Sequence, residues 1–140
     1  MNVGGEVKFP AATVLFTGDR LAATSYLSER APGRVVIGGT ATAGDHGTAT
    51  AGDFGTATAG KYGNATAGLG GTAKAGDFGT ATAGLIGTAT AGDGGTIIIR
   101  WHDHDHDRDR LAVGYVGENG IVAGTAYRCD KVGGFVRAAL

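Results

Sequence analysis

The chain has little of what marks the common functional classes. Its 140 residues include a single cysteine, Cys129, which excludes an internal disulfide framework and a cysteine-rich zinc site. Only 18% of the residues are charged, and the formal net charge is −1. A nearly neutral chain offers no electrostatic attraction to nucleic acid or to a membrane surface. Because 42% of the residues are hydrophobic, the composition is also not that of a disordered chain.

Long apolar runs and enzyme signatures are missing as well. No run approaches the roughly 18 residues of a membrane span, and residues 1–10 lack the basic start of a signal peptide, so we expect a cytoplasmic protein. Neither G-x-S-x-G nor H-E-x-x-H occurs. Cys129 has no histidine nearby in sequence; Arg128 could lower its pKa, but a lone thiol in a strand is more often inert. We expect no enzyme and infer no small-molecule substrate.

Glycine, alanine and threonine dominate the middle of the chain. From Gly39 to Gly94 the sequence repeats every eight residues: GTATAGDH, GTATAGDF, GTATAGKY, GNATAGLG, GTAKAGDF, GTATAGLI and GTATAGDG. Both glycines and both alanines of the octad are invariant, whereas the threonine positions admit Asn64 and Lys74. The alternating T-A-T-A predicts a strand with alanine on the buried face and threonine facing water. Glycine at both ends of the strand would permit the positive φ of a tight corner.

This pattern predicts an all-β fold built on a short β-solenoid over residues 39–94. Two octads per coil would give a flattened, two-sided coil, and three would give a triangular one. We prefer two, because alanine cannot fill a wide interior. Such a thin core buries little apolar surface, so backbone ladders and caps at both ends must supply much of the stability.

The flanks are predicted to be those caps. Residues 1–38 read as an N-terminal cap with strands over Val3–Phe9 and Thr13–Phe16 and a short helix over Arg20–Arg30; a docking element is the alternative. Residues 95–140 read as a C-terminal antiparallel β module that holds the only conventional hydrophobic core. Its expected strands and turns are Ile97–Trp101, Leu111–Val116, a turn at Asn119-Gly120, and a last hairpin between Thr125–Cys129 and Phe135–Val136.

The TATAG octads, followed by TIIIRW, LAVGYVGENGI and GTAYRCDKVGGFV, resemble a group of small bacterial and phage-borne proteins. Those proteins carry short octapeptide arrays that end in a similar small β module. The resemblance covers about residues 39–140. It implies the architecture and a phage or prophage origin, and it supplies no catalytic residues.

The run from His102 to Asp107 alternates histidine with aspartate. In an extended chain His102, His104 and His106 share one side, and an HxH pair can chelate one transition metal such as Zn, Ni, Cu or Fe. A flexible polar loop is the simpler interpretation. The aspartates would continue the face of Ile97 and Ile99 into the core, which a carboxylate cannot enter. We therefore expect the strand to end near Trp101 and the run to form a solvated hairpin tip.

The preferred function is a non-catalytic interaction module that presents a rigid surface to a protein partner or to its own copies as a homo-oligomer. The candidate contact residues are the variable corners His46, Phe54, Tyr62, Phe78 and Ile86, because exposed aromatic side chains usually mean an interface. The alternative is that these side chains fold over the corners as local staples.

Two other functions stay open. A trimeric phage-tail or secretion-type β-helical spike, found in the virion, would use His102, His104 and His106 as its metal site. Alternatively, Thr-x-Thr rows could order water, as in antifreeze and ice-nucleating β-helices, which this chain resembles only in repeat logic. On a 16-residue coil one face would read TAT, TAT, TAK, TAT and the other TAT, NAT, TAT.

Overall fold

The computed structural model describes residues 2–3, 6–7 and 37–138, and this part of the chain consists of β-strands joined by turns, with no helix. Near the N-terminus β1 (Asn2–Val3) pairs antiparallel with β2 (Glu6–Val7). The single strand expected over Val3–Phe9 is therefore wrong, because the chain reverses between these two short strands. The strand expected over Thr13–Phe16 and the helix expected over Arg20–Arg30 lie outside the described residues.

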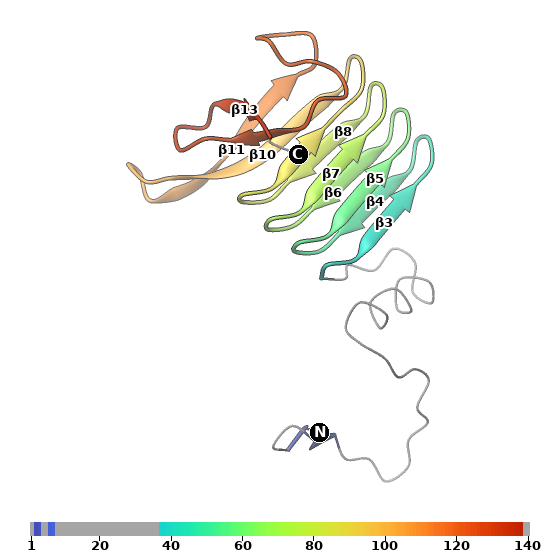
Figure 1. Cartoon of the computed structure of the whole chain (residues 1–140), viewed down its shortest axis with the longest axis vertical. Coiled ribbons are helices and arrows are strands. Elements are labelled where there is room, and N and C mark those ends of the chain that lie inside the picture. The colour runs from blue at the N-terminus through green and yellow to red at the C-terminus, as the bar shows by residue number, and fades with distance from the viewer. Residues whose placement is uncertain (1, 4–5, 8–36, 139–140) are drawn as a thin grey trace.

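The octads form a two-sided solenoid, seen as a stack of flattened coils in Figure 1. Its strands are β3 (Thr40–Ala43), β4 (Thr48–Ala51), β5 (Thr56–Ala59), β6 (Asn64–Ala67), β7 (Thr72–Ala75), β8 (Thr80–Ala83) and β9 (Thr88–Thr90). Strands β3, β5, β7 and β9 pair in parallel in one sheet, and β4, β6 and β8 do so in the other. Thr40 pairs with Thr56, which confirms the coil of two octads.

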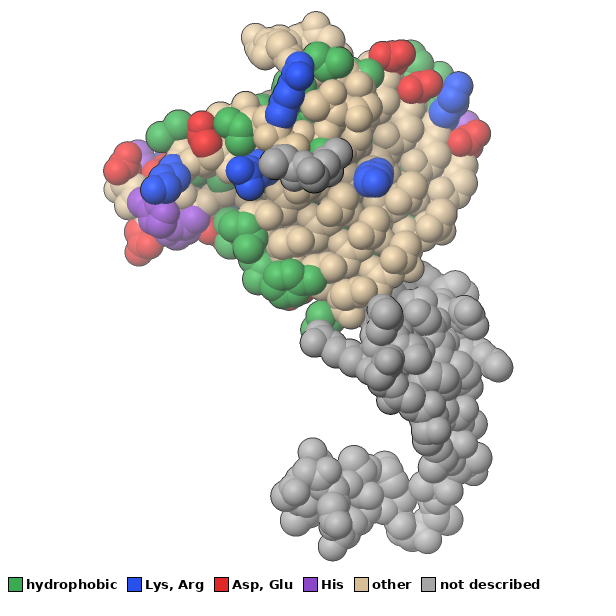
Figure 2. Space-filling model, viewed as in Figure 1, with side chains coloured by type: hydrophobic (Ala, Val, Ile, Leu, Met, Phe, Trp, Pro, Cys, Tyr) green, Lys and Arg blue, Asp and Glu red, His purple; other side chains and the backbone are tan. Residues whose placement is uncertain are grey.

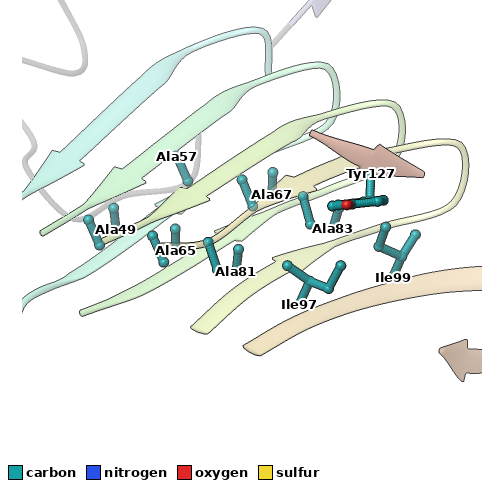
Figure 3. Packing of buried hydrophobic residues seen from close by; sticks show 14 of the residues in the cluster. Ala49, Ala57, Ala65, Ala67, Ala81, Ala83, Ile97, Ile99 and Tyr127 are labelled. Carbon is teal, nitrogen blue, oxygen red and sulfur yellow. The ribbon is translucent and has the colours of Figure 1, made fainter. Parts of the chain in front are cut away.

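Alanine fills the space between the two sheets, as Figure 3 shows for both layers. The inward side chains of Ala57, Ala65, Ala73, Ala81 and Ala89 are fully buried. The threonines between them lie on the outer faces and are mostly half-exposed. The predicted alternation is confirmed, and a methyl group is the largest side chain that so thin a coil accepts between its sheets.

The invariant glycines serve close packing and do not supply the corner conformation, so that expectation is wrong. A Cβ built on Gly63 would lie 2.8 Å from the Cβ of Ala59 and 2.9 Å from the carbonyl oxygen of Gly47. The first glycine of every octad from Gly47 on meets an alanine Cβ in the same way, at 2.7–2.9 Å. Positive φ occurs instead at the eighth octad position, for example 54° at Tyr62.

Antiparallel strands extend both sheets at the C-terminal end. β10 (Thr96–Asp103) pairs in parallel with β8 as far as Ile99, and along its whole length with the antiparallel β11 (Arg108–Tyr115). β12 (Tyr127–Cys129) lies between β9 and β13 (Phe135–Arg137), antiparallel to both. One sheet therefore ends in β11 and the other in β13. The predicted C-terminal antiparallel module is confirmed.

The large apolar side chains of this module do not form a core of their own. Ile97, Ile99, Ile121 and Tyr127 belong to the same buried cluster as the alanines, and Phe135 packs against it. Figure 3 shows Ile97, Ile99 and Tyr127 continuing the row of inward methyl groups. Within residues 37–138 the core is thus continuous, and it widens at the C-terminal end.

Candidate functional site

Each corner of the coil is a four-residue turn with the eighth octad residue at its third position. In Gly44–Gly47 the N–H of Gly47 donates to the carbonyl oxygen of Gly44 at 3.1 Å, and His46 has a φ of 59°. A positive φ at the third residue alone defines a type II turn, which favours glycine there. Gly70 and Gly94 meet this preference. The same left-handed backbone is adopted, with φ between 54° and 59°, by His46, Phe54, Tyr62, Phe78 and Ile86.

Hydrogen bonds between coils fix the corners in place. The N–H of Lys61 donates to the carboxylate of Asp45 at 2.8 Å, one coil back, and the N–H of Leu69 donates to Asp53 at 2.9 Å. The N–H of Tyr62 in turn donates to the carbonyl oxygen of Asp77 at 2.9 Å. Sequence reasoning misses this ladder, although aspartate recurs at the seventh octad position. Hydrogen bonds between coils therefore continue from the sheets around the corners.

His46, Tyr62 and Phe78 form a first corner row along one edge of the solenoid. The rings of His46 and Tyr62 are parallel within 5° with centroids 5.1 Å apart, and those of Tyr62 and Phe78 within 11° at 5.2 Å. The stack matches the coil spacing, and it remains open to solvent, since Tyr62 is 54% and Phe78 59% exposed. These rings therefore staple neighbouring coils and also present an aromatic surface.

Phe54, Gly70 and Ile86 form a second corner row along the other edge. The Phe54 ring lies over Gly70, where an added Cβ would come within 2.7 Å of it. Ile86 is 79% exposed. A groove of about 560 Å³ opens beside this row, and its lining includes Leu85, Ile86, Trp101 and His104. The stacked rings of the first row therefore fit the interpretation as local staples, whereas the exposed side chain of Ile86 does not.

The hairpin tip is more ordered than the sequence suggested. β10 continues past Trp101 to Asp103, whose side chain is only 10% exposed, so the expected end of the strand near Trp101 is wrong. The carboxylate survives burial because Arg110 and the Nδ1 of His106 both bond to its Oδ2, while its Oδ1 accepts the N–H groups of Asp105 and His106. Burial opposes ionisation, but these hydrogen bonds outweigh it and lower the pKa of Asp103 to about 2.

The three tip histidines do not converge on one point. The Nδ1 of His102 lies 2.9 Å from Asp109 and that of His106 2.8 Å from Asp103, whereas the ring of His104 packs edge-on against His102. No group of three or more His, Cys, Asp or Glu side chains in the described ranges is arranged to hold a metal ion. The metal site and the spike that would use it stay predictions.

Cys129 is half-buried beside the groove, on β12. Burial and the neighbouring Asp130 raise the pKa of its thiol to about 11, the opposite of the lowering that Arg128 could give. A thiol with that pKa is protonated at neutral pH and is a weak nucleophile.

The outer sheet faces carry the expected threonine rows. One sheet aligns Thr58 with Lys74, and the other aligns Thr48 with Asn64 and Thr66 with Thr82, as the 16-residue coil requires. Figure 2 shows a broad face that is mostly uncharged, with charged and histidine side chains gathered at the hairpin tip and along one corner.

Comparison of the chain with protein-family models, with curated proteins and with solved structures found no match. Among the residues described, no helix is long and apolar enough to cross a membrane. The candidate site therefore rests on the geometry of the chain itself.

Proposed function

We propose that this chain is a non-catalytic interaction module, and that its two corner rows bind a protein partner. The observation that carries the proposal is that bulky residues occupy corner positions whose backbone favours glycine. Five bulky side chains occupy backbone positions with φ between 54° and 59° that Gly38, Gly70 and Gly94 fill elsewhere in the same rows. A phage or prophage origin, implied by the resemblance, is part of this proposal.

The cost of these residues points to a role beyond folding. A left-handed backbone costs a residue with a Cβ about 1–2 kcal/mol, and a β-branched residue such as Ile86 is a particular outlier there. Stacking of about 0.5–1.5 kcal/mol offsets this for Tyr62 and Phe78. Ile86 is 79% exposed and gains little from burial. Residues held in strained backbone conformations cluster at binding and active sites.

The rigidity of the corners also suits binding. The backbone N–H groups of Tyr62 and Phe78 donate to the next coil at 2.9 and 2.8 Å, so the rings are already placed before a partner arrives. A preorganised surface loses little conformational freedom on binding. Aromatic side chains held in this way are the residues that dominate protein interfaces.

The test is quantitative capture on the immobilised full chain from an extract of the source cells. Tyr62→Gly with Ile86→Gly removes one side chain from each row and keeps a backbone that glycine adopts freely. Thr58→Ser with Thr82→Ser is the matched control on the flat faces. We expect one protein that the wild type and the control retain equally and that the corner variant retains at least tenfold less.

Two results would contradict the proposal. One is that no protein is retained above a column carrying an unrelated chain. The other is a partner that the corner variant retains as well as the wild type does, because binding would then use another surface.

Ice binding is a second candidate, favoured by the threonine rows. Neighbouring strands place Thr50, Thr66 and Thr82 in one unbroken row, at the roughly 4.8 Å spacing of paired strands. This function predicts thermal hysteresis that Thr66→Tyr abolishes and that the corner variant keeps. A wild-type solution that freezes without hysteresis would eliminate it.

A further inference from the structure

Strand β11 leaves an apolar row at the edge of its sheet. It is eight residues long and pairs, among the described strands, with β10 alone. Its outward side chains Leu111, Val113 and Tyr115 are 60%, 47% and 53% exposed, while Ala112 and Gly114 between them are buried. The alternation of large and small residues over 111–115 is the sequence signal for this face.

The free edge of β11 has a defined hydrogen-bonding pattern. The N–H of Val116 donates to the carbonyl oxygen of Gly95 at 2.9 Å. In an antiparallel pair such bonded positions recur at every second residue, so Gly114 and Ala112 also face β10. The backbone groups of Leu111, Val113 and Tyr115 therefore point away from β10, along the same stretch that carries the apolar row. The carbonyl oxygen of Tyr115 also accepts the N–H of Glu118 at 3.1 Å.

An edge of this kind favours pairing with another strand. Proteins usually protect sheet edges with proline, with charges along the strand, or by keeping the strand short. The other sheet follows this rule, because β13 has only three residues and includes Arg137. In β11 the charged residues stop at Arg110, and the five residues that follow are uncharged.

We propose that β11 pairs antiparallel with β11 of a second copy of this chain, about a two-fold axis at Val113. The outward backbone groups require odd-numbered residues to lie opposite odd-numbered ones, so the axis passes through a residue and not between two residues. An axis at Val113 sets Leu111 opposite Tyr115 of the second copy, so all six apolar side chains meet. An axis at Leu111 would instead set Asp109 opposite Val113.

The result is a ten-stranded sheet that runs through both copies, with the hydrogen bonds of the two edges satisfied by each other. This inference deepens the proposed function, since it names a second copy as one partner. It uses a surface separate from the corner rows. The variant with Tyr62→Gly and Ile86→Gly must therefore dimerise like the wild type, and either proposal can fail without the other.

The first test is the solution mass of the untagged full chain by light scattering over a range of concentrations. The wild type is expected to rise from 13.9 kDa toward twice that mass. Val113→Lys should weaken dimerisation at least tenfold. Thr82→Lys, on the outer face of the same sheet, is the matched control and should dimerise normally, since Lys74 occupies the equivalent octad position.

A second substitution distinguishes a loss of dimerisation from a loss of the fold. Val113→Pro removes one outward N–H group and no bond to β10, and edge strands accept proline at such positions. It should be monomeric with the circular dichroism of the wild type. A wild type that stays monomeric at every concentration, or a folded Val113 variant that dimerises normally, would overturn the proposal.

The register has its own test, in a Cys129→Ser background. Val113→Cys should form a disulfide between copies, because paired residues on the axis have Cα atoms about 5.5 Å apart, a distance that disulfides span. Leu111→Cys and Tyr115→Cys should cross-link when mixed and not alone. Self-cross-linking of Leu111→Cys without that of Val113→Cys would place the axis elsewhere and overturn the register.

Discussion

At individual corner residues the backbone is strained, and the exposed side chain gains little from burial in return. Tyr62, Phe78 and Ile86 adopt a backbone that glycine adopts freely, and all three side chains remain more than half exposed. Tyr62 and Phe78 recover part of the strain by stacking across coils. Ile86 is 79% exposed, the most of the three, so its strain is the least compensated by burial.

Replacing Ile86 with glycine should therefore stabilise the chain. We expect Ile86→Gly to raise the free energy of unfolding by about 1 kcal/mol, because the left-handed strain disappears. In Phe78→Gly the lost stacking offsets the same relief, so the change should be under about 0.5 kcal/mol. Urea denaturation followed by circular dichroism measures both. If Ile86→Gly instead lowers the free energy of unfolding, the Ile86 side chain itself stabilises the corner.

At the scale of elements, the β10–β11 hairpin shows where sequence reasoning succeeds and where it stops. The two strands and the turn between them follow from apolar runs on either side of a polar segment. The burial of Asp103 does not, because a carboxylate can follow Ile97 and Ile99 inward only when the Arg110 side chain of the neighbouring strand reaches it. That pairing depends on the register between Trp101 and Arg110, which no local pattern fixes. The same limit explains why His102 and His106, which share one side of an extended chain, bond to different aspartates.

The hairpin tip should respond to pH through His102. The hydrogen bond to Asp109 raises the pKa of His102 above its ordinary value of 6.5, against the opposing effect of burial, and Asp107 adds to it. A raised pKa means that this contribution to stability is complete below pH 6.5 and is lost as the pH rises through the folded-state pKa. The Asp103 contribution behaves oppositely, because its pKa of about 2 makes it complete above its ordinary value of 3.8 and lost as the pH falls toward 2.

Titration of the histidine ring protons by NMR checks this pH dependence. Asp109→Asn should lower the pKa of His102 toward 6.5, and Asp93→Asn, at a corner of the coil outside the groove that His102 lines, serves as the control. A His102 pKa that is unchanged by Asp109→Asn would show that the hydrogen bond is not what raises it.

At the scale of the whole molecule, the invariant positions of the octad made the solenoid predictable. Alanine at both inward positions set the thin two-sided coil, and the coil in turn set the threonine rows. The sequence could not locate the corner strain, because glycine is present on either side of each turn and only the backbone shows that His46 and Ile86 carry the positive φ. Nor could it show that β11 is an unpaired edge, since this depends on which strand ends the sheet.

Every surface described above depends on a coil of sixteen residues. This is tested most directly by paired cysteines in a Cys129→Ser background, with disulfide formation followed by mass spectrometry. Thr58 and Lys74 are paired neighbours in one sheet, so cysteines at these two positions should cross-link within one chain. Cysteines at Thr58 and Thr82, which a coil of three octads would make neighbours, should not cross-link, because they lie in different sheets. Cross-linking of the second pair in place of the first would contradict the coil, and with it the corner rows and the edge that follow from it.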